Sequence, residues 1–231
     1  MLSCLVLKVA ISHTHSSIIL AMTEITKKHS KPYTEPSEGE PRPIRSFVLR
    51  QGRLTKGQQK ALETGWTDFG VNYQTNTLDL PQVFGREASK NVLEIGFGMG
   101  DATAKIAQTL PDTDFLAVEV HQPGVGALLK IMQEEDISNI RIIQHDAVEV
   151  LQHMLADSSL DGVHIFFPDP WHKKRHNKRR LIQAEFVKLL CSKLKVGAYL
   201  HVATDWQEYA EWVLEVLSAE PQLKNIAQDY A

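Results

Sequence analysis

One acidic residue in this chain lies directly before a dense run of basic residues. Asp169 stands between two prolines in the segment FFPDPWHKKRHNKRR, which spans residues 166–180. Six of the eight residues from 173 to 180 are Lys or Arg, and none is acidic. The apolar residues VHIFF (163–167) indicate a buried strand that carries Asp169 to the edge of a sheet. A carboxylate beside cations that can hold phosphates indicates chemistry on a nucleic acid.

A second basic segment supports this interpretation. Residues 41–60, PRPIRSFVLRQGRLTKGQQK, contain six Lys or Arg side chains and no acid, although the whole chain carries a net charge of −3. Positive charge concentrated in two segments suits contact with phosphates better than it suits an evenly solvated surface. A single run of this kind could equally be an ordinary soluble face, but two such runs make that reading weaker.

The segment EIGFGMGDAT (94–103) has the composition of a cofactor-binding turn. It follows the apolar residues VLEI and contains Gly96, Gly98 and Gly100, which allow a tight turn and the close approach of a ligand. A glycine pattern of this kind is weak support by itself, because such loops serve several nucleotide-like cofactors. Glu94 argues against a dinucleotide, since a carboxylate at this place would repel a pyrophosphate bound at the following helix.

Three acidic residues at the ends of successive predicted strands match a cationic nucleoside without phosphates. Glu94 suits the cationic amino acid end of S-adenosylmethionine, and Glu119 can accept from both ribose hydroxyls. Asp146 can accept from the exocyclic amine of adenine, although its place before a helix also fits a simple N-cap. The sequence therefore predicts S-adenosylmethionine as the cofactor, and it disfavours an NAD oxidoreductase.

Alternating apolar runs and amphipathic segments indicate how these residues are positioned. We expect strands at 92–95, 115–120, 139–144, 161–167 and 197–204, helices at 101–110, 122–136, 147–155, 180–194 and 206–219, and a short helix capped near Thr55. This order predicts an α/β fold in which a parallel sheet has helices on both faces. Ligands of such sheets lie beyond the carboxyl ends of the strands, where Asp169 and Asp205 also fall.

Composition predicts two parts of the chain. Residues 1–43 are expected to form a flexible arm, of which 1–21 could stem from a misannotated start, and residues 44–231 the domain itself. Cys4 and Cys191 offer neither a metal-binding spacing nor a disulfide framework, which favours a reducing, cytoplasmic setting. The N-terminal apolar residues are too interrupted to span a membrane. We expect no metal, no membrane association and a monomer.

The chain closely resembles the bacterial tRNA (guanine-N7)-methyltransferase family. The matching pieces run in order from about residue 44 to residue 220: RSFVLRQGRLTKGQ, VLEIGFGMGDAT, Glu119, HDA (145–147), FPDPWHKKRHNKRR and TDWQEYAEW. The resemblance implies a Rossmann-like class I methyltransferase that transfers a methyl group from S-adenosylmethionine to N7 of guanine 46 in the variable loop of tRNA.

The resemblance also implies roles for individual residues. Asp169 corresponds to the catalytic residue and also borders the cofactor site, and Lys173 and Asp205 correspond to substrate contacts. The remaining basic stretch corresponds to an RNA contact made by Arg175, His176, Asn177, Lys178, Arg179 and Arg180. From the residue types alone, Trp171 could stack on an extruded base or pack in the core, and Asp205 could be only the N-cap of the last helix. Trp206 and Trp212 are expected to be packing residues.

The chain departs from the family pattern after LKNIAQDY (223–230), where a closing pair of strands with a Thr-rich substrate contact would follow. Without these strands, the fifth predicted strand would be an exposed edge of the sheet. Two alternative functions stay open: a tRNA-binding protein whose catalysis is impaired by the shortened C-terminus, and a methyltransferase that acts on an exocyclic base amine.

Overall fold

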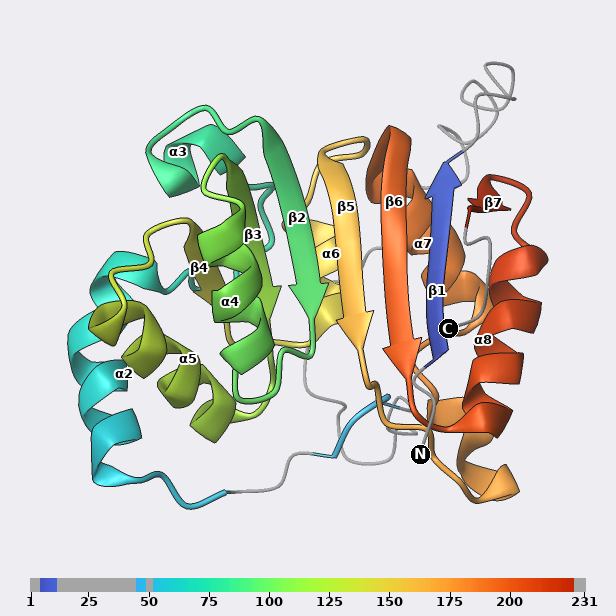
Figure 1. Ribbon diagram of the computed structural model, residues 1–231, viewed down its shortest axis with the longest axis horizontal. Helices are drawn as coiled ribbons and strands as arrows, with labels where there is room; N and C mark the ends of the chain where they lie inside the picture. The colour runs from blue at the N-terminus through green and yellow to red at the C-terminus, as the bar shows by residue number, and fades with distance from the viewer. Residues whose placement is uncertain (1–4, 12–44, 49–51, 227–231) are drawn as a thin grey trace.

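The computed structural model describes residues 5–11, 45–48 and 52–226, which form a seven-stranded sheet covered by helices (Figure 1). The strands are β1 (Leu5–Ile11), β2 (Lys90–Ile95), β3 (Thr113–Val118), β4 (Ile140–Ile143), β5 (Leu160–Phe166), β6 (Leu194–Thr204) and β7 (Leu223–Asn225). The helices are α2 (Lys56–Phe69), α3 (Leu80–Phe84), α4 (Asp101–Thr109), α5 (Gln122–Glu134), α6 (Ala147–His153), η2 (Lys174–Arg179, a 3-10 helix), α7 (Ala184–Lys193) and α8 (Gln207–Ser218).

The five strands predicted from the sequence form the parallel centre of the sheet, in the order β4-β3-β2-β5-β6. The chain builds outward from β2 to β3 and β4, and then crosses to the other side of β2 to form β5 and β6. Strand order therefore reverses between β2 and β5. In open α/β sheets, ligands bind beyond the carboxyl ends of the strands at such a switch point.

Side-chain alternation along the strands separates two apolar layers. Val92 of β2 packs in a layer with residues of α2, α4 and α5, whereas its neighbour Leu93 packs in the opposite layer with residues of α3, α6, α7 and α8. Figure 1 shows the two sets of helices on opposite faces of the sheet. Because both faces of β2 and β3 are covered, these strands read as nearly continuous apolar runs in the sequence.

The structure differs from the sequence-based prediction at the far edge of the sheet. Residues 5–11, which we assigned to the flexible arm, form β1 and pair antiparallel with β6 from Leu5↔Thr204 to Ala10↔Tyr199. The short strand β7 pairs with the other side of β1. The expected exposed edge at β6 is therefore wrong, because β1 covers it. The other residues of the expected arm, 1–4 and 12–43, lie outside the described residues, and the boundary at residue 43 stays a prediction.

The predicted cap at Thr55 is confirmed and brings an N-terminal segment to the carboxyl edge of the sheet. The Thr55 hydroxyl accepts from the Gln58 backbone N–H, and the Gln58 side chain accepts from the Thr55 N–H, which completes a capping box. Just before this cap, a Cβ placed on Gly52 would come within 2.8 Å of the side chains of His121 and Pro123. The chain thus runs closely over the start of α5.

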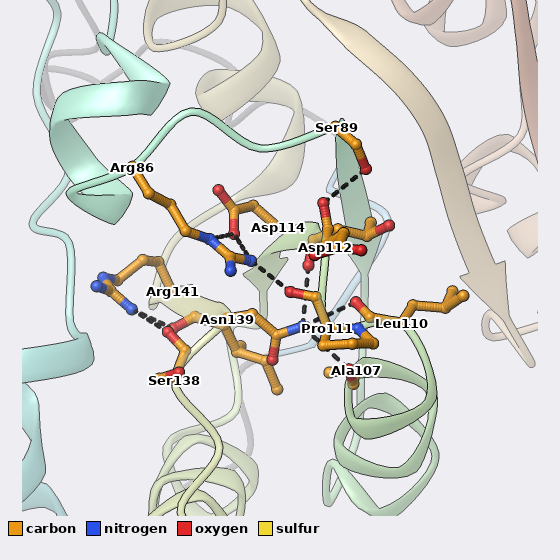
Figure 2. A network of polar contacts seen from close by, with 12 residues as sticks. Arg86, Ser89, Ala107, Leu110, Pro111, Asp112, Asp114, Ser138, Asn139 and Arg141 are labelled. Carbon is orange, nitrogen blue, oxygen red and sulfur yellow. Dashed lines mark hydrogen bonds and ion pairs between the residues drawn. The ribbon is translucent and has the colours of Figure 1, made fainter.

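The amino edge of the sheet is closed by structural contacts (Figure 2). The Asn139 side-chain amide donates to three backbone carbonyls at the end of α4 and the start of β3, at 2.9–3.1 Å. Arg86 donates twice to the buried carboxylate of Asp114, and Arg141 donates to nearby carbonyls. This edge is a clamp between elements, and the predicted site residues lie at the opposite edge. None of the helices in the described segments is long and apolar enough to cross a membrane.

Candidate active site

The glycine turn after β2 has the conformation that its sequence predicts. Gly96, Gly98 and Gly100 have φ angles of 76°, 60° and 86°, a region that other residues rarely adopt. A Cβ on Gly100 would lie 2.6 Å from Leu128, and a Cβ on Gly124 would lie 2.0 Å from the Gly98 carbonyl oxygen. The start of α5 is therefore packed against the turn, and Gly124 is as necessary to it as the three predicted glycines.

Glu94 is a buried carboxyl group that is only half satisfied by the protein. It is 2% exposed, and its Oε1 accepts a 3.0 Å hydrogen bond from the Thr103 hydroxyl on α4. Its Oε2 is buried and has no hydrogen-bond partner within the part of the chain that the structure describes. Burial raises the pKa of Glu94 to about 7, while the bond from Thr103 acts in the opposite direction. A cationic ligand group in the glycine turn would supply what this oxygen lacks.

Glu119, directly after β3, is held by the backbone on both carboxylate oxygens. Oε1 accepts from the N–H groups of Val120 and His121, at 2.7 and 2.9 Å, and Oε2 accepts from the Gly98 N–H at 3.0 Å. The last bond connects the end of β3 directly to the glycine turn. Each carboxylate oxygen can accept more than one hydrogen bond, so Oε2 retains capacity for a ligand hydroxyl.

Asp146, at the start of α6, has the capping role that was left open for it. Its Oδ1 accepts from the Val148 N–H at 2.9 Å, and burial is the main cause that raises its pKa. The turn before α6 is held by a cluster that sequence reasoning missed. The Tyr73 ring stacks on His145 at 3.7 Å between centroids, and His145 Nε2 lies 2.5 Å from Glu149 Oε2.

The three acidic residues therefore end three neighbouring strands, β2, β3 and β4, around one glycine turn. The donor set fits S-adenosylmethionine, because the buried Glu94 oxygen without a partner can pair with a cationic ligand group. The same arrangement disfavours a dinucleotide, whose pyrophosphate would face Glu94. The structure thus brings the predicted cofactor residues of this half of the site together.

Asp169 lies in a strained loop on the other side of the switch point. It is exposed, and its Oδ1 accepts from the Trp171 backbone N–H at 3.1 Å. Phe167 and Trp171 flank the loop with φ angles of 49° and 47°, which are uncommon for bulky residues. The Phe167 N–H donates to the Ala203 carbonyl of β6 at 2.8 Å, so the loop is tied to the end of the neighbouring strand. Strain held in this way is typical of functional sites.

Trp171 is a scaffold of this loop. Its indole N–H donates to the Ser46 carbonyl at 3.0 Å, and the Arg179 guanidinium lies 5.0 Å from the centre of its ring. The ring of His176 meets it edge-on at 5.8 Å. Trp171 thus connects the N-terminal basic segment, the Asp169 loop and η2. Of the two interpretations left open by the sequence, these contacts favour packing.

The predicted RNA-contacting residues form η2 and its flanks. Lys173, at the N-cap of η2, is exposed, as are Lys174, Arg175 and Lys178. Desolvation and the surrounding cations, of which Arg175 is the strongest, lower the pKa of His176. The neighbouring cations thus disfavour the protonated form of this histidine. The backbone carbonyl oxygen of Asn177 accepts a hydrogen bond from the Gln183 side-chain amide, which fixes the end of η2.

Arg180 departs from the prediction that it contacts RNA. Its side chain is 1% exposed, Nε–H donates to the Pro170 carbonyl at 3.0 Å, and Nη2 lies 2.8 Å from Glu208 Oε1. The guanidinium also lies 5.3 and 5.4 Å from the ring centres of Tyr209 and Trp212. Arg180 is thus an internal anchor of the Asp169 loop. The sequence could not distinguish it from its exposed neighbours, because all six cations belong to one run.

Asp205 follows β6 and is exposed near the same loop. The N-cap of α8 is Trp206, and no side chain caps that helix, so the capping interpretation of Asp205 does not hold. Trp212 packs as expected, with its indole N–H donating to the Ile182 carbonyl at 2.8 Å. Trp206 differs from that expectation, since 41% of its surface is exposed.

The strand order, the glycine turn and the half-satisfied Glu94 together define a class I S-adenosylmethionine-dependent methyltransferase. Residues 88–231 match the methyltransferase family model Methyltransf_4. The tRNA (guanine-N(7)-)-methyltransferase of Methylobacillus flagellatus is 73% identical over 190 residues, which cover 82% of this chain and 80% of that protein. The protein of the same name from Chromobacterium violaceum is 62% identical, over 82% of this chain and 84% of that protein. The one from Neisseria meningitidis serogroup B is 61% identical, over 84% of this chain and 81% of that protein.

The chain therefore belongs to the tRNA (guanine-N7)-methyltransferase family. Among solved structures, an antibiotic-related methyltransferase aligns with a TM-score of 0.46 and 18% identity, over 62% of this chain and 76% of that chain.

Proposed function

We propose that this protein transfers a methyl group from S-adenosylmethionine to N7 of a guanine in tRNA, at position 46 of the variable loop. Family membership supports the substrate class, and the sequence resemblance supports the position. The observation that carries the proposal is the placement of exposed Asp169 across the switch point from the glycine turn, beside the basic surface of η2. We further propose that the protein acts as a monomer in the cytoplasm.

Methylation of guanine N7 requires little chemical activation of the nucleophile. It already carries an in-plane lone pair, so no proton has to be removed before it attacks a methyl group. The enzyme must chiefly hold nucleophile and methyl group in line at near-attack distance. Asp169 is suited to this role, because a carboxylate can accept from guanine N1–H and the exocyclic amine together. Adenine cannot reproduce that pair of donors.

The residues around the glycine turn and those of the Asp169 loop have different roles in this reaction. When bound, S-adenosylmethionine supplies a methyl group on a positively charged sulfur. Transfer of this methyl group would leave the electron pair of the carbon–sulfur bond on sulfur and the positive charge on the purine ring. Glu94, Glu119 and Asp146 would hold the amino acid end, the ribose and the adenine. Asp169 faces the developing cationic ring and stabilises it electrostatically.

The cations of η2 and its flank are assigned to the RNA backbone. Lys173, with Asp205, would contact the nucleotide that enters the site, while Arg175 and Lys178 would hold neighbouring phosphates. Arg179 stands over Trp171 and would share both tasks, loop packing and phosphate contact. Arg180 acts only through the loop that it anchors.

The Asp169→Asn variant tests this function. We expect methyl incorporation into unmodified tRNA to fall by at least about 100-fold, because one acceptor of the guanine clamp becomes a donor, while S-adenosylmethionine binding measured by calorimetry stays within about twofold. Asp112→Asn, at the opposite edge of the sheet, is the matched control and should retain wild-type turnover. Near-normal turnover of Asp169→Asn would refute the clamp.

Mapping the modified nucleotide separates the alternatives. Digestion of labelled tRNA should release N7-methylguanosine from position 46. A label on an exocyclic amine would favour the other base methyltransferase. Wild-type protein that binds tRNA but incorporates no methyl group would favour the tRNA-binding protein without catalysis.

A further inference from the structure

Trp206 is a large aromatic residue that the fold leaves exposed beside the proposed acceptor site. It lies between β6 and α8, directly after Asp205, and 41% of its surface is accessible. Its backbone N–H donates to the Thr204 hydroxyl at 3.3 Å, which fixes the turn. The ring of His172 meets its ring edge-on at 4.1 Å between centroids. An exposed, locally fixed indole offers an aromatic face on which a nucleic-acid base can stack.

The other tryptophans near the site are already engaged. Trp171 donates its indole N–H to Ser46 and lies under the Arg179 guanidinium. Trp212 donates its indole N–H to Ile182 and lies beside the buried Arg180. Among the described residues, no hydrogen bond of the Trp206 indole N–H is present, and His172 is the one aromatic ring that meets it. Trp206 is therefore the indole best able to receive a planar ligand.

The position of Trp206 connects it to both exposed carboxylates. Asp205 is its neighbour in sequence, and His172, which touches its ring, lies three residues after Asp169. The Phe167–Ala203 backbone hydrogen bond holds the Asp169 loop against the end of β6, from which Trp206 follows. A base whose edge is held by Asp169 or Asp205 would lie beside the Asp169 loop, with its face near Trp206.

We propose that the Trp206 indole is the surface on which the target guanine stacks. This inference rests on the proposed function and adds the residue that orients the base. Carboxylate contacts fix the edge of guanine but leave its plane free to tilt, whereas an aromatic face fixes the plane. Together the two contacts hold N7 in the line of attack. Trp206 is thus a positioning residue for the methyl transfer, and the stacking role first considered for Trp171 passes to it.

A binding cycle between protein and RNA tests the contact without requiring catalysis. The dissociation constants of wild type and Trp206→Ala are measured for two tRNA transcripts, one with guanine 46 and one with an abasic site at that position. Loss of a base–aromatic stack should weaken binding of the normal transcript by about 5- to 150-fold. If guanine 46 stacks on Trp206, the difference in affinity between the two transcripts should be much smaller for Trp206→Ala than for wild type, because only the carboxylate contacts to the base edge remain. Trp206→Phe should recover most of the difference.

Phe167→Ala is the comparison variant, because Phe167 is the other exposed aromatic residue of the loop, at 57%. The factor by which Phe167→Ala weakens tRNA binding should be the same for both transcripts, so that it multiplies with the factor lost at the abasic site. The proposal is overturned if the two losses multiply for Trp206→Ala, or if Phe167→Ala alone removes the dependence on guanine 46. Failure of the proposed function would look different, since wild type would then not discriminate the two transcripts or would not methylate the normal one.

Discussion

At the scale of single residues, Glu94 and Glu119 show how burial gives two glutamates different chemistry. Glu119 is satisfied by three backbone N–H groups, whereas Glu94 has one hydroxyl donor and one buried oxygen without a partner. Burial accordingly raises the pKa of Glu94 from its usual value of 4.5 to about 7. A cationic ligand group can supply the hydrogen bond that the protein does not give to this oxygen.

The raised pKa of Glu94 predicts how stability without cofactor depends on pH. The unfolded chain releases the proton of Glu94 near pH 4.5 and the folded protein only near pH 7, so stability falls as pH rises between these values and stays lower above them. Glu94→Gln should remove this dependence. We expect the variant to gain up to roughly 3 kcal/mol over wild type at pH 8, and little at pH 4.5, in urea unfolding.

The same variant should bind S-adenosylmethionine more weakly, because the neutral amide offers no charge to its amino group. Between pH 5.5 and 7.5, wild-type affinity should rise as Glu94 ionises, while that of Glu94→Gln should change much less. Thr103→Val, which removes only the hydroxyl that bonds Glu94, is the control and should keep the pH dependence. A pH-independent wild-type affinity would contradict the proposed pairing of Glu94 with a cation.

At the scale of elements, the Asp169 loop is held in its strained conformation by contacts from three directions. The end of β6 binds Phe167, the Ser46 carbonyl binds Trp171, and Arg180 binds the Pro170 carbonyl while pairing with α8. A loop with two bulky residues at positive φ requires such support. The basic run therefore contains both a structural cation and cations that face solvent.

Arg180→Lys should separate these two kinds of cation. Lysine cannot bond Pro170 and Glu208 with one planar fork, so the loop should lose its position. We expect kcat to fall about 10- to 100-fold, with tRNA affinity and its salt dependence nearly unchanged. Steady-state kinetics and filter binding at several salt concentrations provide these quantities. A normal kcat together with weakened tRNA binding would instead return Arg180 to the RNA surface.

Arg175→Gln is the matched variant on the exposed side of η2. Removing one phosphate contact should weaken tRNA binding and reduce the slope of log affinity against log salt by about 1, with S-adenosylmethionine binding unchanged. An unchanged slope would show that Arg175 does not contact a phosphate.

Sequence reasoning predicted the elements well where local signals were strong. Apolar runs predicted β2 to β6, and the capping residue Thr55 predicted the start of α2. It failed where the outcome depends on tertiary contacts. Nothing local distinguishes buried Arg180 from exposed Arg175, or exposed Trp206 from packed Trp212. The support that Thr103 gives to Glu94 was missed for the same reason, since the partners meet only when α4 folds back on β2.

At the scale of the whole molecule, the strands that lead to the site and the edge strands β1 and β7 belong to one sheet. β1 lies antiparallel between β6 and β7, and its residue Val9 is 4% exposed. The strand that carries Asp205 therefore has a neighbour on both sides. Only the five parallel strands of this sheet could be predicted from the sequence. The segment that forms β1 has no clear alternation and no turn signals around it.

Val9→Pro tests whether β1 supports the sheet. Proline removes a backbone donor opposite Leu200 and Asn225 and does not fit the interior of a strand. We expect unfolding in urea to require about 3 kcal/mol less free energy. Val9→Ala retains the backbone donor, so a clearly smaller loss in this variant would assign the remainder to the ladder. Equal stability of Val9→Pro and wild type would show that β1 contributes nothing to the fold.

The reversal of strand order between β2 and β5 has a consequence for protein engineering. The residues that we propose to bind the methyl donor lie at the ends of β2, β3 and β4, and those that we propose to face the nucleobase follow β5 and β6, on the other side of the β2–β5 pair. We expect the two specificities to be separable. Loops after β5 and β6 could be replaced together by those of an enzyme that modifies another base, and the donor half would require no redesign.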